Sequence, residues 1–252
     1  LIPAWWTEEI GKMRVVIPED EKKALTHYAY HIKAGKEIFA AEGAFGQYLI
    51  CFRDYPVAIG ITAGASEYLA ADICLKYIKE AVQIPCEKEN LEEAQEKLEE
   101  KLVHLTLPKP EGDKKDTNEA TKKLLNKRIV FTENPRQIES AVISTVGEEL
   151  KLELTVAGEK KILFAGYKDW KCNDMYPNDF TKRYHAVSYA FDEDALYLSV
   201  GLLNTSYREE YCLWVNSENV VVGTWRPNVT YLPAEEDMTW KFTGTFEPSC
   251  IL

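Results

Sequence analysis

From Arg128 onward, short β-prone segments alternate with turn residues. Turn signals such as Asn134-Pro135, Ala157-Gly158 and Asp192-Glu193-Asp194 separate these segments. Many short strands at a spacing of roughly ten residues are typical of a closed barrel or a sandwich. We therefore expect an all-β region with strands over residues 128–133, 138–144, 150–156, 161–164, 184–191, 196–203, 211–215, 220–225 and 240–246.

Residues 41–64 form the most distinctive stretch of the first half of the chain. Two β-prone apolar runs flank a short charged turn that ends at Pro56, and a proline cannot continue a strand ladder. The pattern predicts a β-hairpin. Both runs are apolar nearly throughout, so we expect both faces of their sheet to be covered.

The segments around this hairpin predict further elements. Apolar and polar residues alternate over 26–32, which indicates one strand, and we expect three antiparallel strands between about residues 26 and 63. Helical spacing predicts a helix over 66–82, capped by Ser66, and a second helix over 87–102. Near the start of the chain, Thr7 is expected to cap a short helix.

Residues 42–48, with the sequence Glu-Gly-Ala-Phe-Gly-Gln-Tyr, resemble a motif in the closing strands of the serine β-lactamase, penicillin-binding protein and esterase family, class C-like members included. The resemblance implies an α+β fold in which closing antiparallel strands and a C-terminal helix complete the catalytic domain. It also implies a lipocalin-like β domain afterwards, because residues 105–108 resemble the usual lead-in to such a domain.

The resemblance assigns roles to three residues. Ala41-Glu42-Gly43 lies where the family has a Lys-Thr-Gly motif, and the backbone N–H of Ala44 takes the place of an oxyanion-hole donor. Glu42 and Gly43 occupy motif positions, and the Glu42 carboxylate would suit neutral or cationic substrates. The alternative is that Glu42 is a solvated charge at a strand end, and we give this alternative more weight.

The nucleophile of that family is missing from this chain. Catalysis there requires Ser-x-x-Lys, and none of the serines has a lysine three residues later. The family also has a Tyr-x-Asn motif before its Lys-Thr-Gly motif, but the one such triplet here, at Tyr176, follows Ala41-Glu42-Gly43 and is therefore in the wrong order. We therefore interpret the chain as the C-terminal portion of a hydrolase that cleaves amide, ester or β-lactam bonds, with no turnover of its own.

A non-catalytic module that binds a ligand or another protein is the alternative interpretation. The β region contains Trp170, Trp214, Trp225 and Trp240, which could line a ligand cavity, although such aromatic residues more often fill a barrel core. We divide the chain into a hydrolase-like part (1–86), an acidic helix with a polar linker (87–126) and a β domain (127–252). The expected partner is a missing N-terminal half of the catalytic domain, or a second copy bound through an uncovered sheet face.

Composition excludes several functions. The chain of 252 residues has 41 acidic and 30 basic residues, a formal net charge of -11, which argues against binding to nucleic acid or to an anionic membrane surface. We find no apolar run of membrane-spanning length, and we expect no metal or cofactor site, since His27 and His31 would lie too far apart along one strand. The six cysteines lack C-x-x-C spacing, so we expect reduced thiols and weakly favour the cytoplasm, although the family resemblance also allows the cell envelope.

Overall fold

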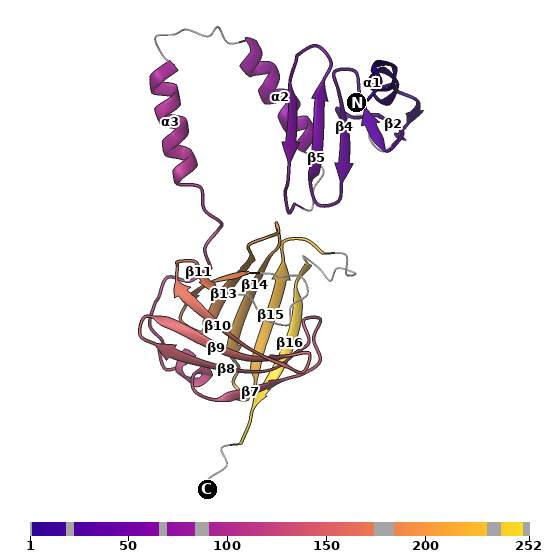
Figure 1. Cartoon of the computed structure of the whole chain (residues 1–252). Helices are drawn as coiled ribbons and strands as arrows, with labels where there is room; N and C mark the ends of the chain where they lie inside the picture. Colours follow the sequence, from indigo (N-terminus) through magenta and orange to yellow (C-terminus); the bar gives the residue numbers. More distant parts are fainter. Residues whose placement is uncertain are drawn as a thin grey trace. The chain divides into compact units, whose positions relative to one another are not determined.

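The computed structural model describes residues 2–18, 23–65, 70–83, 91–173, 184–230 and 238–248. The chain divides into two compact units, Leu1–Thr106 and Leu107–Leu252, and each is described by itself (Figure 1).

The first unit contains an antiparallel sheet whose strands follow one another in chain order. A short helix, α1 (Ala4–Ile10), precedes the sheet. The strands are β1 (Val15–Val16), β2 (His27–Ala29), β3 (Ile32–Ala34), β4 (Ile38–Gly43), β5 (Gln47–Phe52) and β6 (Ala58–Ile61). The predicted hairpin over 41–64 is present as β5 and β6, but its first run is divided, because a turn at residues 44–46 separates β4 from β5. Five strands therefore lie between residues 27 and 61, where three were expected.

Two further local predictions for this unit are wrong. The strand expected over 26–32 is broken, because Tyr30 and His31 adopt left-handed backbone angles, with φ of 49° and 61°, and turn the chain from β2 into β3. Two successive residues with positive φ are the geometry of a tight hairpin turn. Thr7 does not cap α1 but lies inside it, and its hydroxyl donates to the Ala4 carbonyl at 2.7 Å.

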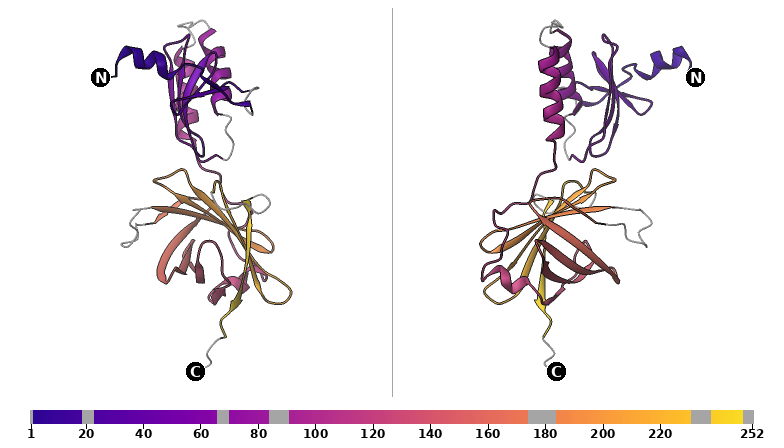
Figure 2. Two further views of the ribbon diagram at one scale, coloured as in Figure 1. Left: turned by 90° about the vertical axis from the view of Figure 1, so that its right-hand side faces the viewer. Right: turned by 60° about the vertical axis from the view of Figure 1, so that its left-hand side comes forward.

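Helix α2 (Ala70–Gln83) covers one face of the sheet (Figure 2). Side chains of β5 alternate, so Tyr48, Ile50 and Phe52 are buried and share a core with Ala71. On the opposite face Leu49 is 54% exposed, so within this unit the expectation of two covered faces holds for one face only. The predicted cap, Ser66, lies outside the described residues.

Helix α3 (Leu91–Val103) has no buried residue. Its apolar stripe of Leu91, Leu98 and Leu102 is more than half exposed at each position. On its polar side, Lys97 and Glu93 lie one turn apart and form an ion pair of 2.5 Å, which supports the helix. The predicted start of this helix, at residue 87, lies outside the part of the chain that the structure describes.

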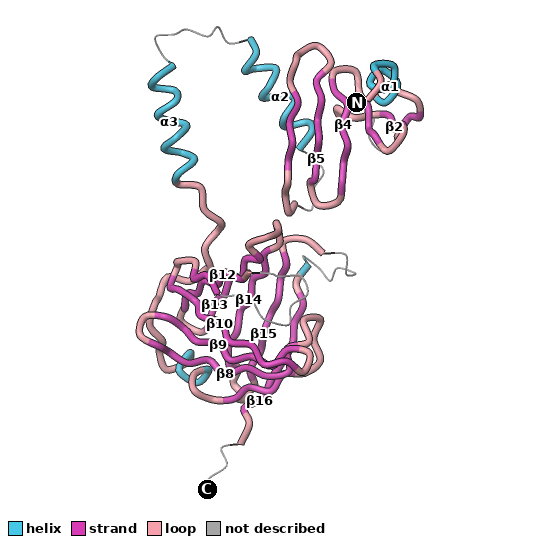
Figure 3. Tube along the Cα trace, viewed as in Figure 1, coloured by secondary structure: helices cyan, strands magenta, loops and turns pink. Residues whose placement is uncertain are grey.

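The second unit is a closed β-barrel (Figure 3). The strand spacing in the sequence allowed either a barrel or a sandwich, and the structure has the barrel. The ring runs β12–β13–β14–β15–β16–β7–β8–β9–β10 and returns to β12. The strands are β7 (Arg128–Phe131), β8 (Ile138–Val146), β9 (Glu149–Val156), β10 (Glu159–Tyr167), β11 (Lys171–Asn173), β12 (His185–Phe191), β13 (Ala195–Leu202), β14 (Arg208–Val215), β15 (Val221–Pro227) and β16 (Trp240–Phe246).

Closure of the barrel depends on one edge of β12, which two strands share. β10 pairs with it in parallel at Gly166↔Ser188 and Tyr167↔Tyr189. Short β11 pairs antiparallel with the preceding residues of β12. Sequence reasoning does not predict β11, because three residues carry too little alternation to be recognised.

Residues 107–126 form part of the barrel unit, although the stretch 109–123 reads as a linker in the sequence. Lys114 and Phe191 exchange two backbone hydrogen bonds of 2.9 and 2.8 Å. A 3-10 turn, η3 (Thr121–Leu124), ends in Leu124, which is fully buried in the barrel core. The polar composition of this stretch thus conceals a backbone attachment to β12 at Lys114 and a buried leucine at its end.

Candidate ligand cavity inside the barrel

The interior of the barrel contains a cavity of about 120 Å³. Side chains alternate along each strand, and the inward set is aliphatic or aromatic over most of the wall. The apolar lining residues are Phe131, Ile138, Ala141, Ile143, Leu152, Leu154, Val156, Leu163, Leu198, Val200, Leu213 and Phe242. An apolar wall of this kind favours an apolar occupant.

Three polar side chains form a connected group in the wall of this cavity. The Tyr211 hydroxyl donates to Glu209 Oε2 at 2.6 Å, and Arg136 Nη2 lies 3.1 Å from Glu209 Oε1. The Glu209 side chain is 11% exposed, whereas that of Arg136 is 41% exposed. Both oxygens of a nearly buried carboxylate therefore have a partner, as a buried charge requires.

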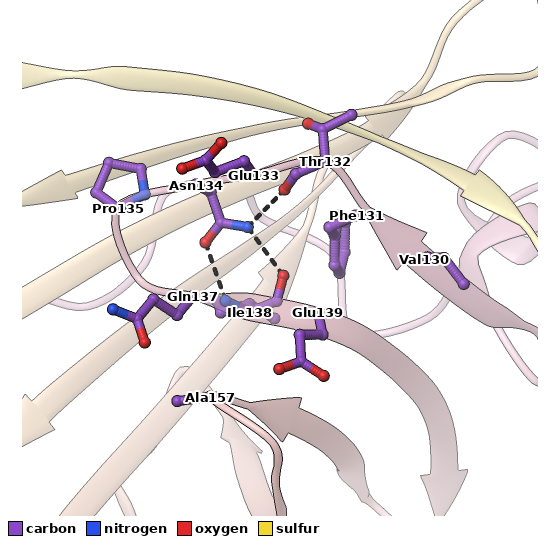
Figure 4. A pocket seen from close by; sticks show the side chains of 10 residues that line it. All are labelled: Val130, Phe131, Thr132, Glu133, Asn134, Pro135, Gln137, Ile138, Glu139 and Ala157. Atoms are coloured by element: carbon purple, nitrogen blue, oxygen red, sulfur yellow. Dashed lines mark hydrogen bonds between the residues drawn. The ribbon is translucent and has the colours of Figure 1, made fainter.

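The loop between β7 and β8 brings Arg136 to this position. Asn134 holds the loop, because its amide donates to the carbonyls of Thr132 (2.9 Å) and Ile138 (2.8 Å) and accepts from the Ile138 N–H at 3.0 Å (Figure 4). The Arg136 guanidinium lies 5.8 Å from the centre of the Trp225 ring, within the range of a cation–π contact. The outer side of the loop borders an open hollow of about 780 Å³, which is lined mainly by exposed residues.

The surroundings fix the protonation of this group. Burial raises the pKa of Tyr211 well above its ordinary value, and the Glu209 charge raises it further. Burial opposes the charge on Arg136, but Glu209 and Tyr211 together outweigh burial, so the pKa of Arg136 is raised. At neutral pH the site therefore presents a neutral phenol and a charged guanidinium.

These features support binding better than chemistry. A dry cavity of roughly 150 Å³ lined by Leu, Ile and Phe is known to hold benzene, so about 120 Å³ suits a molecule near that size. The tryptophans of the barrel do not line this cavity. Trp225 and Trp240 instead pack against each other at 4.8 Å in the core, as the sequence analysis favours. Lys161 and His185 are the other polar lining residues.

The residues that the family resemblance singles out lie in the first unit. Gly43 ends β4 opposite Gln47, and Ala44 is the first residue of the following turn, where Phe45 has a φ of 63°. The sequence analysis favours a solvated charge at Glu42, and the structure contradicts this. The Glu42 side chain is 10% exposed, and its Oε2 lies 3.1 Å from Lys33 Nζ. Ser66 is the one serine in the sequence of residues 1–106, and it lies outside the described residues.

No metal site is found among the described residues. His27 hydrogen-bonds with the neighbouring Thr26, and His31 Nδ1 lies 3.1 Å from the Tyr28 hydroxyl. In the described helices we find none with the length and apolar character needed to cross a membrane. Cys51, Cys74, Cys172 and Cys212 carry free thiols.

Sequence reasoning missed Arg136 and Glu209. The sequence contains a signal for Glu209, because Glu209, Tyr211 and Leu213 are alternate residues of one strand and therefore point to the same side of the sheet. Arg136 belongs to a loop, and nothing near it in the sequence indicates its partner.

Comparisons with known proteins place few constraints on this chain. No protein-family model and no curated protein matches it, so these comparisons do not support an origin in the β-lactamase family. Among solved structures, apo lipid binding protein 8 of Caenorhabditis elegans aligns at 7% sequence identity with a TM-score of 0.39, over 51% of this chain and 98% of that chain. A likeness of this degree carries no argument about function, and the description of the second unit as a closed β-barrel with a small apolar cavity depends on its own strand pairing.

Proposed function

We propose that the barrel unit binds a small, mostly apolar molecule that carries one polar group. The observation behind this proposal is the apolar cavity with the Arg136–Glu209–Tyr211 group in its wall. A cavity that is apolar except for a few fixed polar groups is the usual form of a small-molecule site.

The polar group of the ligand would be a hydrogen-bond acceptor. The Tyr211 hydroxyl is already committed to Glu209, and the Glu209 carboxylate has partners at both oxygens. Arg136 contacts this carboxylate through Nη2 and has five N–H donors in all. Its remaining donors can therefore reach an oxygen of the ligand without breaking the existing group.

Benzene and phenol form a matched pair of probes, because phenol adds one hydroxyl to the same ring. We expect saturable shifts of the Ile143, Leu152 and Leu163 methyl signals in a ¹H–¹³C NMR titration, with tighter binding of phenol. Ala141→Leu should abolish the shifts, because Ala141 is 4% exposed and lines the cavity. Val146→Leu is the control on the same strand, since Val146 is 49% exposed. Absence of saturable shifts in the unaltered protein, or their persistence in A141L, would contradict the proposal.

We also propose that the first unit closes the catalytic domain of a serine hydrolase. Supporting this, β4, β5, β6 and α2 occur in the order that the resemblance of residues 42–48 implies. The missing half of that domain, or a second copy of the chain, would then cover the face that carries Leu49, and Ala44 would supply the oxyanion donor.

Incubation of the 252-residue chain with a chromogenic β-lactam and a p-nitrophenyl ester tests this second proposal. We expect no turnover, because Ser-x-x-Lys is absent, and robust turnover would refute the assignment. The intact mass of the native protein provides an independent measurement, since a larger product would reveal an upstream half. A native mass equal to that of this chain would argue against the proposal.

A further inference from the structure

A second hollow, of about 440 Å³, lies on the outer surface of the barrel over β13, β14 and β15. Residues 108–111 of the same unit form part of its wall. Glu209 and Tyr211 face the interior cavity, so the alternate residues Glu210 and Cys212 point outward into this hollow. The interior cavity and this outer hollow thus lie on opposite faces of the same strands.

The strand register gives the floor of this hollow an ordered set of polar groups. Ser199, Glu210 and Arg226 lie directly opposite one another across β13, β14 and β15. The next row consists of Tyr197, Cys212 and Thr224 in the same order. Side chains directly opposite on one sheet face approach to about 5 Å between Cβ atoms, so these rows form one continuous polar surface.

Two arginines share a single carboxylate on this floor. Arg226 donates through Nε (3.0 Å) and Nη2 (2.6 Å) to Glu210 Oε2. Arg208 Nη2 lies 3.1 Å from Glu210 Oε1. The charges of Lys109 and Glu111, which also line the hollow, cancel each other. The two arginines and Glu210 therefore leave an excess of one positive charge. This local excess contrasts with a chain whose net charge is -11.

Ser199 adds a hydrogen-bonding group at the base of the hollow. The residue is 1% exposed and lines the hollow, and it lies directly opposite Glu210. Burial raises the pKa of the neighbouring Cys212 thiol to about 11, so at neutral pH this thiol contributes no negative charge.

We propose that this outer hollow binds a small molecule through a carboxylate or phosphate group. The anion accepts hydrogen bonds from the Ser199 hydroxyl and from the N–H groups of Arg226 and Arg208 that Glu210 leaves available. Guanidinium groups match both kinds of anion in planar, paired geometry. The volume of about 440 Å³ is within the usual range of small-molecule sites, roughly 300–1,000 Å³. This inference does not depend on the function proposed for the interior cavity.

Isothermal titration calorimetry with inorganic phosphate and with succinate, at matched ionic strength in sodium chloride, tests the inference. Saturable binding of either probe supports it, and the probe that binds more tightly identifies the anion class. Arg226→Gln should weaken binding about tenfold or more, because a charge-assisted hydrogen bond is lost. Glu210→Gln should tighten binding, since the competing carboxylate is removed while its shape remains.

Arg128→Gln is the matched control. The Arg128 side chain is 51% exposed, as is that of Arg226, and it also pairs with a glutamate across neighbouring strands, Glu247 at 3.8 Å. This variant should bind as the unaltered protein does, and circular dichroism should show that all three variants keep the barrel fold. The inference is overturned if neither probe binds the unaltered protein or E210Q, if R128Q loses as much affinity as R226Q, or if a folded E210Q binds more weakly.

Discussion

Removal of the Tyr211 hydroxyl tests whether the polar group in the barrel wall is a stabilising unit. Tyr211→Phe keeps the ring and deletes the donor that Glu209 Oε2 receives at 2.6 Å. Glu209 is 8% exposed, so little water can replace the lost hydrogen bond. The remaining partner of the carboxylate is Arg136.

The expected loss follows from the charge of the acceptor. A hydrogen bond to a charged group contributes about 1.5–3 kcal/mol to stability, against about 0.5–1.5 kcal/mol for one between neutral groups. Tyr189 provides the matched control, because its hydroxyl donates to an uncharged acceptor in the same barrel, the backbone carbonyl of Glu148, at 3.2 Å. We therefore expect Y211F to lower the free energy of unfolding by about 2 kcal/mol and Y189F by about 1 kcal/mol.

Urea unfolding followed by tryptophan fluorescence measures both losses, because Trp170, Trp214, Trp225 and Trp240 report on the barrel. Folding raises the pKa of Tyr211, so its contribution to stability is present below pH ~10, the ordinary tyrosine value, and is lost as the pH rises further. The alkaline decline should therefore be shallower in Y211F. Equal losses for Y211F and Y189F at pH 7 would refute the reasoning.

Two other predictions concern the barrel. A Cβ added at Gly223 would lie 2.4 Å from the Phe242 ring, so Gly223→Ala should lower the free energy of unfolding by about 1–3 kcal/mol through overpacking. Gly60→Ala, where nothing lies within 4 Å of the added Cβ, should leave the thermal midpoint of unfolding unchanged or slightly raised. A barrel transition unaffected in G223A would contradict this prediction. Because the pKa of Cys212 is raised to about 11 and Cys172 is exposed, a disulfide reagent at pH 8 should label Cys172 before Cys212, as mapped by mass spectrometry. The contribution of Cys212 to stability should be complete below pH ~9 and be lost toward pH 11, and the reverse order of labelling would count against its burial.

The barrel strands could be predicted because they are short β-prone segments separated by turn signals. Strand β16 matches its predicted bounds of 240–246, and most other strands differ by a few residues at one end. Strand β14 was predicted to begin at Tyr211, because two adjacent glutamates disfavour a strand. It begins at Arg208, and this error removed Glu209 from the wall of the barrel.

The candidate site could not be predicted, for a related reason. Its arginine is supplied by a loop that Asn134 holds in place through three hydrogen bonds, and its carboxylate lies on a strand that is distant in sequence. In the first unit, local alternation over 26–32 predicted one strand, and the turn at Tyr30 and His31 contains neither glycine nor asparagine to mark it. Closure of a barrel is likewise a long-range property that no short window contains.

The ring of strands has one unusually short join. β10 and β12 meet over two residue pairs, Gly166↔Ser188 and Tyr167↔Tyr189, whereas β12 and β13 meet over seven. Parting this join opens the ring into a curved sheet and leaves every longer ladder intact. Native-state opening should therefore begin here. If the barrel binds the small molecule proposed above, the opened join would give that molecule a route to the interior, because Leu163 on β10 and His185 on β12 line the cavity.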